Sequence, residues 1–162
     1  MFLHMGNKKL YTLTFIVRDG RVLLGMKKRG FGAGRYNGFG GKVEEGETIE
    51  QGAHRETKEE CGIGITEMEK VGIHEFEFAD KRGDILEVHV FRVKGYKWEP
   101  VETEEMKPEW FEEENIPFDT MWPDDRYWLP LFLDGKKFRT KFLFGEGDKV
   151  LEQHIREVDS LT

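Results

Sequence analysis

Alternating apolar and polar side chains indicate that strands dominate this chain. The predicted strands are rich in β-branched and aromatic residues and cover residues 10–17, 21–26, 67–78, 85–93 and 138–144. Between the first two, Asp19-Gly20 is a favoured two-residue hairpin turn. Residues 151–158 have apolar positions at helical spacing, but their hairpin context favours another strand.

Two stretches have the sequence marks of helices. In the first, Thr48 and Gln51 form a capping box, and Gly62 stands where a left-handed C-terminal cap would fall. The second covers residues 126–133, with Asp124 as its expected N-cap. Strands with two principal helices and additional hairpins predict an α/β (α+β) fold, in which helices pack against a mixed sheet.

Length and composition favour one globular domain. The 162 residues are 38% hydrophobic and 13% aromatic, which suits a single domain over 1–162, with residues 1–9 expected to be a flexible N-terminus. The formal net charge of −7 argues against nucleic-acid and anionic-membrane partners, because both require a basic face. The lone Cys61 excludes an internal disulfide framework and receives no catalytic role.

The first predicted helix carries an unusual group of acids. Glu56, Glu59 and Glu60 are spaced i, i+3 and i+4 and therefore share one face of the helix. Like charges at this spacing repel one another, whereas converging carboxylates suit a hard divalent cation. The alternative is an ordinary acidic helix that faces solvent.

A basic, glycine-rich segment precedes this acidic helix. Residues 21–42 carry six Lys or Arg and no acid, whereas residues 44–60 carry seven acids. Glycines let the backbone approach a ligand closely, and Lys or Arg neutralise phosphate oxygens. The two segments are suited to hold a phosphate chain bridged by a metal, and on composition alone a mobile solvated loop is an equal alternative.

The spacing of this region resembles the Nudix box. The matching positions are Gly41, Glu47, Arg55, Glu56, Glu59, Glu60, Gly62 and Ile63. The one departure is Thr57, at a position that is apolar in the pattern. Further stretches resemble the oxidised purine nucleoside triphosphatases of the Nudix superfamily, the animal MutT homologues; these are residues 25–43, 76–78, 88–91, 121–125 and 156–159.

The resemblance implies an αβα sandwich with a central mixed sheet, and a Mg²⁺-dependent pyrophosphohydrolase for which Mn²⁺ is a substitute. Such an enzyme converts 8-oxo-dGTP or 2-hydroxy-dATP to the monophosphate plus pyrophosphate and so removes oxidised purines from the nucleotide pool. The resemblance further implies a monomer that takes a small-molecule nucleotide in the cytoplasm, with the mitochondrial and nuclear pools as alternatives.

A set of site residues also carries over from the resemblance. The implied metal ligands and catalytic groups are the carbonyl of Gly40 and the carboxylates of Glu56, Glu59, Glu60 and Glu105. Either Glu56 or Glu105 would activate the attacking water, and Arg55 with Glu47 would form an orienting ion pair. The implied substrate-binding residues are Thr12, Lys27, Phe31, Asn37, Phe39, Gly40, Gly41, Lys42, Phe76, Trp122, Pro123, Asp124 and Asp125.

Two adjacent carboxyl groups bear on substrate choice. Asp124 and Asp125, facing an uncharged base edge, are expected to have coupled and divergent titrations. A protonated carboxyl donates a hydrogen bond and an ionised one accepts, so exchange of these states would let one pocket read two oxidised purines.

Tyr36 and Leu86 stand at positions where the mammalian enzymes carry other residues. The order of preference among oxidised and alkylated purine substrates therefore stays open. The alternatives in function are a Nudix hydrolase of another nucleoside diphosphate derivative and a non-catalytic nucleotide sensor.

Overall fold

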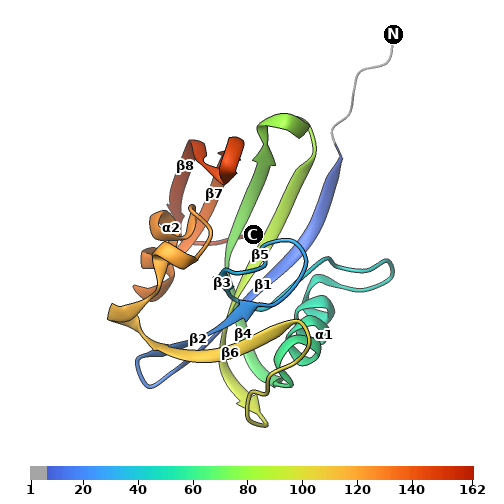
Figure 1. The fold of residues 1–162 in the computed structure, drawn as a ribbon, viewed down its shortest axis with the longest axis vertical. Helices are drawn as coiled ribbons and strands as arrows, with labels where there is room; N and C mark the ends of the chain where they lie inside the picture. Colours follow the sequence, from blue (N-terminus) through green and yellow to red (C-terminus); the bar gives the residue numbers. More distant parts are fainter. Residues whose placement is uncertain (1–6) are drawn as a thin grey trace.

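The computed structural model describes residues 7–162, in which strands form a sheet that is flanked by two α-helices (Figure 1). In chain order the elements are β1 (Lys8–Arg18), β2 (Arg21–Lys27), β3 (Tyr36–Asn37), α1 (Ile49–Cys61), β4 (Gly64–Phe78), β5 (Ile85–Lys97), β6 (Met106–Glu112), α2 (Asp125–Leu133), β7 (Lys137–Phe144) and β8 (Val150–Val158). Short 3₁₀ turns cover Ala79–Lys81, Glu113–Asn115, Phe118–Thr120 and Glu146–Asp148.

The strands form one mixed sheet. Its order is β3-β2-β1-β5-β4-β7-β8, and β6 pairs with β2 outside this path. The pairs β1–β5 and β4–β7 are parallel, whereas the other strand pairs are antiparallel. The parallel pair β1–β5 and the antiparallel pair β4–β5 place β1 and β4 on either side of β5, so that distant parts of the chain meet at the centre of the sheet.

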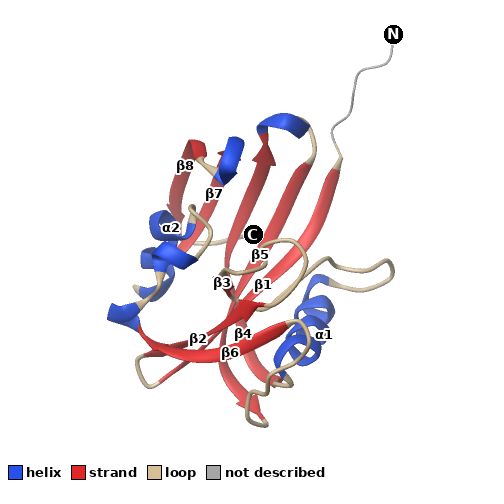
Figure 2. Cartoon of the chain, in the orientation of Figure 1, coloured by secondary structure: helices blue, strands red, loops and turns tan. Residues whose placement is uncertain are grey.

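The two helices cover opposite faces of this sheet (Figure 2). Because side chains alternate across a strand, Phe15 and its neighbour Ile16 in β1 point to different faces and belong to different core clusters. Trp128, Leu129 and Phe132 of α2 lie in the cluster of Phe15, and Cys61 at the end of α1 lies in the cluster of Ile16. The architecture is therefore an αβα sandwich with a central mixed sheet, as expected.

The predicted turn at Asp19-Gly20 and the predicted caps of α1 are confirmed. Asp19 and Gly20 both have positive φ, 51° and 74°, as a two-residue hairpin turn requires. At α1, Thr48 Oγ1 accepts from the Gln51 N–H at 3.0 Å and Gln51 Oε1 accepts from the Thr48 N–H at 2.8 Å. Gly62 closes the helix in the left-handed region at φ 77°.

Several strand boundaries differ from the expected ones. β4 begins at Gly64, three residues before its predicted start, and β5 continues to Lys97. The short β3 and the whole of β6 were not predicted, because a glycine-rich segment and the proline at 108 disfavour strands locally. Both are held by pairing with β2, which is a tertiary effect.

The N-terminal prediction is tested only in part. Residues 1–6 lie outside the described residues, but Lys8 and Lys9, which were included in the expected flexible segment, are part of β1.

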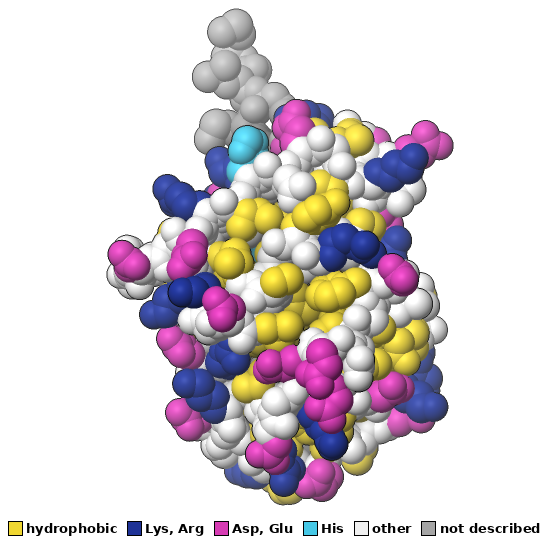
Figure 3. Space-filling model, turned by 90° about the vertical axis from the view of Figure 1, so that its left-hand side faces the viewer, with side chains coloured by type: hydrophobic (Ala, Val, Ile, Leu, Met, Phe, Trp, Pro, Cys, Tyr) yellow, Lys and Arg dark blue, Asp and Glu magenta, His cyan; other side chains and the backbone are white. Residues whose placement is uncertain are grey.

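On the face shown in Figure 3, basic and acidic side chains lie interspersed around a central group of apolar ones.

Within residues 7–162 no helix has both the length and the apolar character needed to cross a membrane.

Candidate active site

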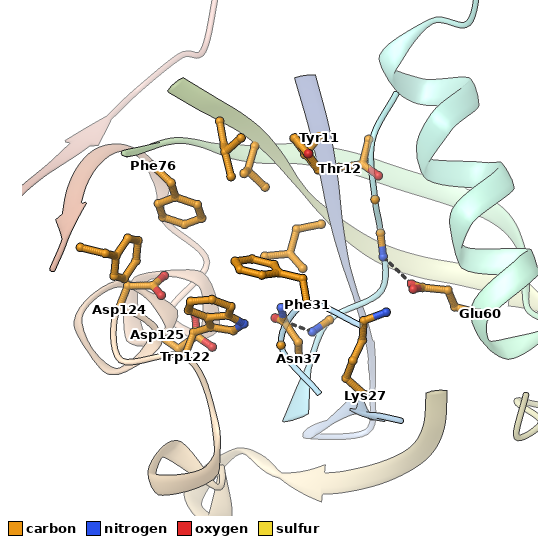
Figure 4. Close-up of a pocket in the computed structure, with 18 of the residues that line it drawn as sticks. Tyr11, Thr12, Lys27, Phe31, Asn37, Glu60, Phe76, Trp122, Asp124 and Asp125 are labelled. Atoms are coloured by element: carbon orange, nitrogen blue, oxygen red, sulfur yellow. Dashed lines mark hydrogen bonds between the residues drawn. The ribbon is translucent and has the colours of Figure 1, made fainter. Parts of the chain in front are cut away.

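A cavity of about 310 Å³ opens on the α2 side of the sheet. Its floor comes from β1, β4 and β5, and its walls come from the glycine-rich segment after β2 and from the segment that enters α2. Ten residues implied as substrate-binding line it: Thr12, Lys27, Phe31, Asn37, Gly40, Gly41, Phe76, Trp122, Asp124 and Asp125. Figure 4 shows Trp122, Asp124 and Asp125 at one end and Glu60 at the other, with Phe31, Asn37 and Lys27 between them. We call the first end the base end and the second the acidic end.

Aromatic rings form the walls of the base end. The Phe31 ring lies 5.0 Å from Trp122 and 6.2 Å from Phe78, although 70% of Phe31 is exposed. The Arg35 guanidinium lies 4.3 Å above the Trp122 ring and donates to Asp148 at 2.9 Å, so it holds the ring from outside the cavity. Rings in this arrangement provide flat apolar surfaces on which a purine can stack.

Asp124 and Asp125 are almost fully buried behind these rings, with 3% and 2% of each residue exposed. The Trp128 indole N–H donates to Asp124 Oδ2 at 2.8 Å, whereas Asp125 Oδ2 has no hydrogen-bond partner within residues 7–162. Burial raises the pKa of Asp124 to about 6. Burial, together with the adjacent Asp124 charge, raises the pKa of Asp125 well above its ordinary value.

The expected helix-capping role of Asp124 is wrong. Asp124 occupies the N-cap position of α2, but its side chain makes no capping hydrogen bond. Its oxygen points instead to Trp128 one turn later. The carboxyl group therefore remains available at the cavity wall.

Asn37 lies between the two ends of the cavity. Its Oδ1 accepts from the Gly38 N–H at 2.8 Å, and this bond orients the side chain from β3. The amide nitrogen of Asn37 is a donor that can face a ligand.

The acidic end is built around Glu60 on α1. Glu60 is 6% exposed, and its Oε1 accepts from the Gly40 N–H at 2.7 Å. Burial raises the pKa of Glu60 to about 7, and the charges of Glu56 and Glu105 contribute to this rise.

The other carboxylates at the acidic end are paired with basic side chains. Glu105 Oε1 accepts from Arg29 at 2.6 Å and its Oε2 accepts from Lys27 at 3.2 Å, which lowers the pKa of Glu105. On α1, Arg55 donates to Glu56 at 2.9 Å and to Glu59 at 3.2 Å. Burial nevertheless raises the pKa of Glu56.

The predicted orienting ion pair is present. Arg55 donates through Nε and one terminal nitrogen to the two oxygens of Glu47, at 2.7 and 2.9 Å, which lowers the pKa of Glu47 to about 2. The same guanidinium donates to the Lys42 carbonyl at 3.1 Å. Arg55 therefore ties the middle of α1 to the segment that precedes it.

The residues at the acidic end fit a divalent cation by their chemistry. Within residues 7–162 no three His, Cys, Asp or Glu side chains are already arranged around one metal position, because the carboxylates point to Arg55, Lys27 and Arg29. Oxygen donors are the ligands that Mg²⁺ prefers, and burial, with a smaller contribution from the charges of Glu56 and Glu105, raises the pKa of Glu60, an effect that a bound cation would oppose.

Three implied substrate-binding residues do not line the cavity. Phe39 is fully buried in the core cluster on the α1 side of the sheet, because alternation turns it away from its neighbours at 38 and 40. Lys42 is exposed, and Pro123 lines a separate shallow groove outside Trp122.

Sequence reasoning missed much of the apolar lining: Tyr11, Leu13, Gly32, Gly38, Phe78, Val88, Met106 and Phe144. Strand alternation is a signal that finds some of them, because Phe78 stands two residues from Phe76, and Val88 two residues from Leu86, which also lines the cavity. Tyr36 does not line it, and its ring packs edge-on against Phe111 at 5.0 Å.

Comparisons with known proteins identify the family of this chain. The NUDIX domain matches residues 9–132. The chain is 52% identical over 156 residues to the oxidized purine nucleoside triphosphate hydrolase of Mus musculus, covering 96% of this chain and 99% of that protein. It is 50% identical over 157 residues to a protein of the same name from Danio rerio, covering 97% and 100%.

Among solved structures, the mutator MutT protein from Bacillus halodurans superposes with a TM-score of 0.81 at 24% identity, covering 91% of this chain and 97% of that one. This similarity supports the fold. The chain belongs to the Nudix family of hydrolases, whose members generally use a divalent metal.

Proposed function

We propose that this protein is a Mg²⁺-dependent pyrophosphohydrolase, with Mn²⁺ as a substitute metal. It would convert oxidised purine nucleoside triphosphates, 8-oxo-dGTP and 2-hydroxy-dATP, to the monophosphate plus pyrophosphate, and so sanitise the nucleotide pool. The names of the relatives from Mus musculus and Danio rerio support this substrate class. The observation that carries the proposal is one cavity with buried Asp124 and Asp125 at one end and, at the other, Glu60, whose neighbours Glu56 and Glu105 lie outside the lining.

The metal would be held by the Gly40 carbonyl and by the carboxylates of Glu56, Glu59, Glu60 and Glu105. When bound, a divalent cation stabilises the charge that develops on the phosphate oxygens and orients the water that attacks phosphorus. Lys27, which lines the cavity beside Glu105, would contribute a positive charge to the phosphate chain.

We assign the role of general base to Glu56 rather than Glu105. Glu56 is half-buried and its pKa is raised, which improves a carboxylate as a proton acceptor. Glu105 has a lowered pKa because two cations, Arg29 and Lys27, hold it. A proton taken from water by Glu56 balances the step, since the attacking oxygen enters one phosphate product and pyrophosphate leaves.

At the base end, Trp122 and Phe31 would stack on the purine, and Phe76 would complete the apolar wall. Asn37, Asp124 and Asp125 would read the base edge through hydrogen bonds. A carboxyl group that is protonated donates to a carbonyl of an oxidised purine, and an ionised one accepts from a ring N–H. Divergent titration of Asp124 and Asp125 would allow two base edges to be read.

The proposal extends to the setting of the reaction. The chain would act as a cytoplasmic monomer on free nucleotides, without a nucleic-acid or membrane partner, and the mitochondrial and nuclear pools are alternatives. The net charge of −7 supports the absence of a nucleic-acid or anionic-membrane partner, because an acidic protein repels polyanions.

Pyrophosphate release tests the proposal. With Mg²⁺, kcat/KM for 8-oxo-dGTP and for 2-hydroxy-dATP should each exceed that for dGTP at least tenfold, and no release should occur after chelation of the metal. Equal rates on the three triphosphates would contradict the assignment of the base end. Tight nucleotide binding without release would favour a non-catalytic sensor, and release only from other nucleoside diphosphate derivatives would favour a different Nudix substrate.

A further inference from the structure

A buried polar pair lies directly behind the base end, outside the cavity. His74 in β4 is fully buried and Thr140 in β7 is 4% exposed, and the two residues are partners in the parallel register of these strands. His74 Nδ1 and Thr140 Oγ1 share a hydrogen bond of 2.6 Å. The imidazole is otherwise surrounded by aromatic rings, including Phe138 at 5.4 Å and Phe142 at 6.2 Å.

Packing alone does not account for this pair. Aliphatic side chains of similar size would fill the same space without burying polar atoms, whose burial is costly unless they are hydrogen-bonded. His74 Nε2 has no hydrogen-bond partner within the part of the chain that the structure describes. The hydrogen bond instead orients the side chain, because one directional bond selects one rotation of the imidazole ring.

The imidazole contacts two groups that define the base end. It stacks on the Phe76 ring with a centroid distance of 4.9 Å and an interplanar angle of 17°. It also meets the Trp128 indole edge-on at 4.3 Å. Phe76 lines the cavity (Figure 4), and the Trp128 N–H donates to Asp124 at 2.8 Å.

A continuous series of contacts therefore joins the Thr140 hydroxyl to the carboxyl that faces the base. The hydroxyl fixes the imidazole, the imidazole fixes the Trp128 ring, and the indole N–H fixes Asp124. The same imidazole sets the tilt of Phe76. Burial lowers the pKa of His74 to about 3, so the ring is neutral near neutral pH and acts as a fixed aromatic plate.

We propose that His74 and Thr140 are positioning residues that set the discrimination between oxidised purines, by fixing Phe76 and the Trp128–Asp124 hydrogen bond. This inference rests on the proposed function for its substrates. Neither residue touches the cavity, so the effect is on the geometry of the base end and not on the chemistry at the acidic end. A shifted carboxyl affects the binding of two purines with different base edges unequally. The ratio of kcat/KM for the two substrates is therefore the sensitive quantity.

Isosteric replacement of Thr140 tests this proposal. Thr140→Val removes the hydroxyl and keeps the shape, whereas Thr140→Ser keeps the hydroxyl. We expect Thr140→Val to change the ratio of kcat/KM for 8-oxo-dGTP and 2-hydroxy-dATP by about threefold to tenfold, the range that corresponds to one net hydrogen bond. The change should lie in KM, with kcat within about twofold of wild type, and Thr140→Ser should restore the ratio. Lys141→Gln, an exposed change one residue along β7, should leave the ratio unaltered.

The double variant His74→Leu/Thr140→Val separates positioning from stability. Because both polar partners are replaced by apolar groups, its free energy of unfolding should equal or exceed that of wild type, while the substrate ratio remains altered. A wild-type ratio in this stably folded variant and in Thr140→Val, with an active wild type, would overturn the proposal. If wild type hydrolyses neither oxidised purine, the proposed function fails. The role of His74 and Thr140 is then tested by the binding of 8-oxo-dGMP. A Kd raised by Thr140→Val supports a positioning role, and an unchanged Kd overturns it.

Discussion

The two ends of the cavity both contain carboxyl groups with raised pKa values, but different groups face them. At the acidic end, Glu56 is paired with Arg55, and Glu60 accepts from a main-chain N–H and lies near Lys27. At the base end, Asp124 accepts from an indole N–H and Asp125 Oδ2 has no partner within residues 7–162.

This difference teaches how one residue type can serve two chemistries. Carboxylates surrounded by cations and by flexible side chains can become ionised and turn toward a metal, because charge is compensated there. At the base end the two enclosed carboxyls differ: Asp125, beside the Asp124 charge, favours the neutral form and keeps a proton to donate, whereas Asp124, with a pKa of about 6, is mostly ionised at neutral pH. Substitutions can therefore disturb each end of the cavity separately.

The largest effect is expected at the acidic end. Glu56→Gln removes the proposed base and one metal ligand, so kcat should fall about 10³-fold, which corresponds to about 4 kcal/mol of transition-state stabilisation. Steady-state kinetics with Mg²⁺ measure the loss, and titration with Mn²⁺ measures metal affinity. The Kd for 8-oxo-dGMP should stay within about threefold of wild type. A kcat close to wild type would show that Glu56 is not the base.

A second prediction concerns charge at the base end. The pKa of buried His74 is lowered from 6.5 to about 3, so the folded state resists protonation that the unfolded state accepts. Stability is therefore lost as the pH falls below 6.5, by about 3 kcal/mol at pH 4. We expect the free energy of unfolding, measured with denaturant, to fall between pH 7 and pH 4 by about 3 kcal/mol less in His74→Leu than in wild type.

The pH dependence has the opposite sign for Asp125. Its folded-state pKa lies well above 3.8, so the unfolded state releases the proton first and the folded protein loses stability as the pH rises above about 4. Asp125→Asn does not titrate, so as the pH rises from 4 to 7 its free energy of unfolding should increase relative to that of wild type. If the free energy of unfolding changed equally in the two proteins between pH 4 and pH 7, a neutral Asp125 would be contradicted.

The smallest predicted effect is confined to the helix that carries the acidic end. Thr48→Ala removes one half of the capping box and should lower the free energy of unfolding by about 1 kcal/mol, whereas Thr48→Ser should retain it. Affinity for Mn²⁺ should weaken slightly because α1 is less fixed. The ratio of kcat/KM between the two oxidised purines should not change, and a changed ratio would show that the ends are coupled.

Features that depend on local sequence could be predicted. The hairpin at Asp19-Gly20, the capping box at Thr48 and the cap at Gly62 require particular residues at particular spacings, and all three were found as expected. The same holds for the Arg55–Glu47 pair, because both residues belong to one motif.

Features that depend on tertiary contacts could not be predicted. β6 forms against β2 despite its proline, and Phe39 turns into the core although its neighbours line the cavity. The His74–Thr140 bond joins residues 66 positions apart, so neither residue alone carries a signal. One local prediction was also wrong: Asp124 stands at the cap position of α2, but its side chain accepts from Trp128 one turn later in the same helix and not from a main-chain N–H.

The most direct test of the two-ended cavity is a comparison of kcat/KM for 8-oxo-dGTP, 2-hydroxy-dATP and dGTP in wild type, Glu56→Gln and Asp124→Asn. Our account predicts that Glu56→Gln lowers all three values by a similar factor and leaves their ratios intact. Asp124→Asn should instead change the ratio between the two oxidised purines about tenfold or more. Altered ratios in Glu56→Gln, or an equal loss on all three substrates in Asp124→Asn, would contradict the assignment of chemistry to one end and base recognition to the other.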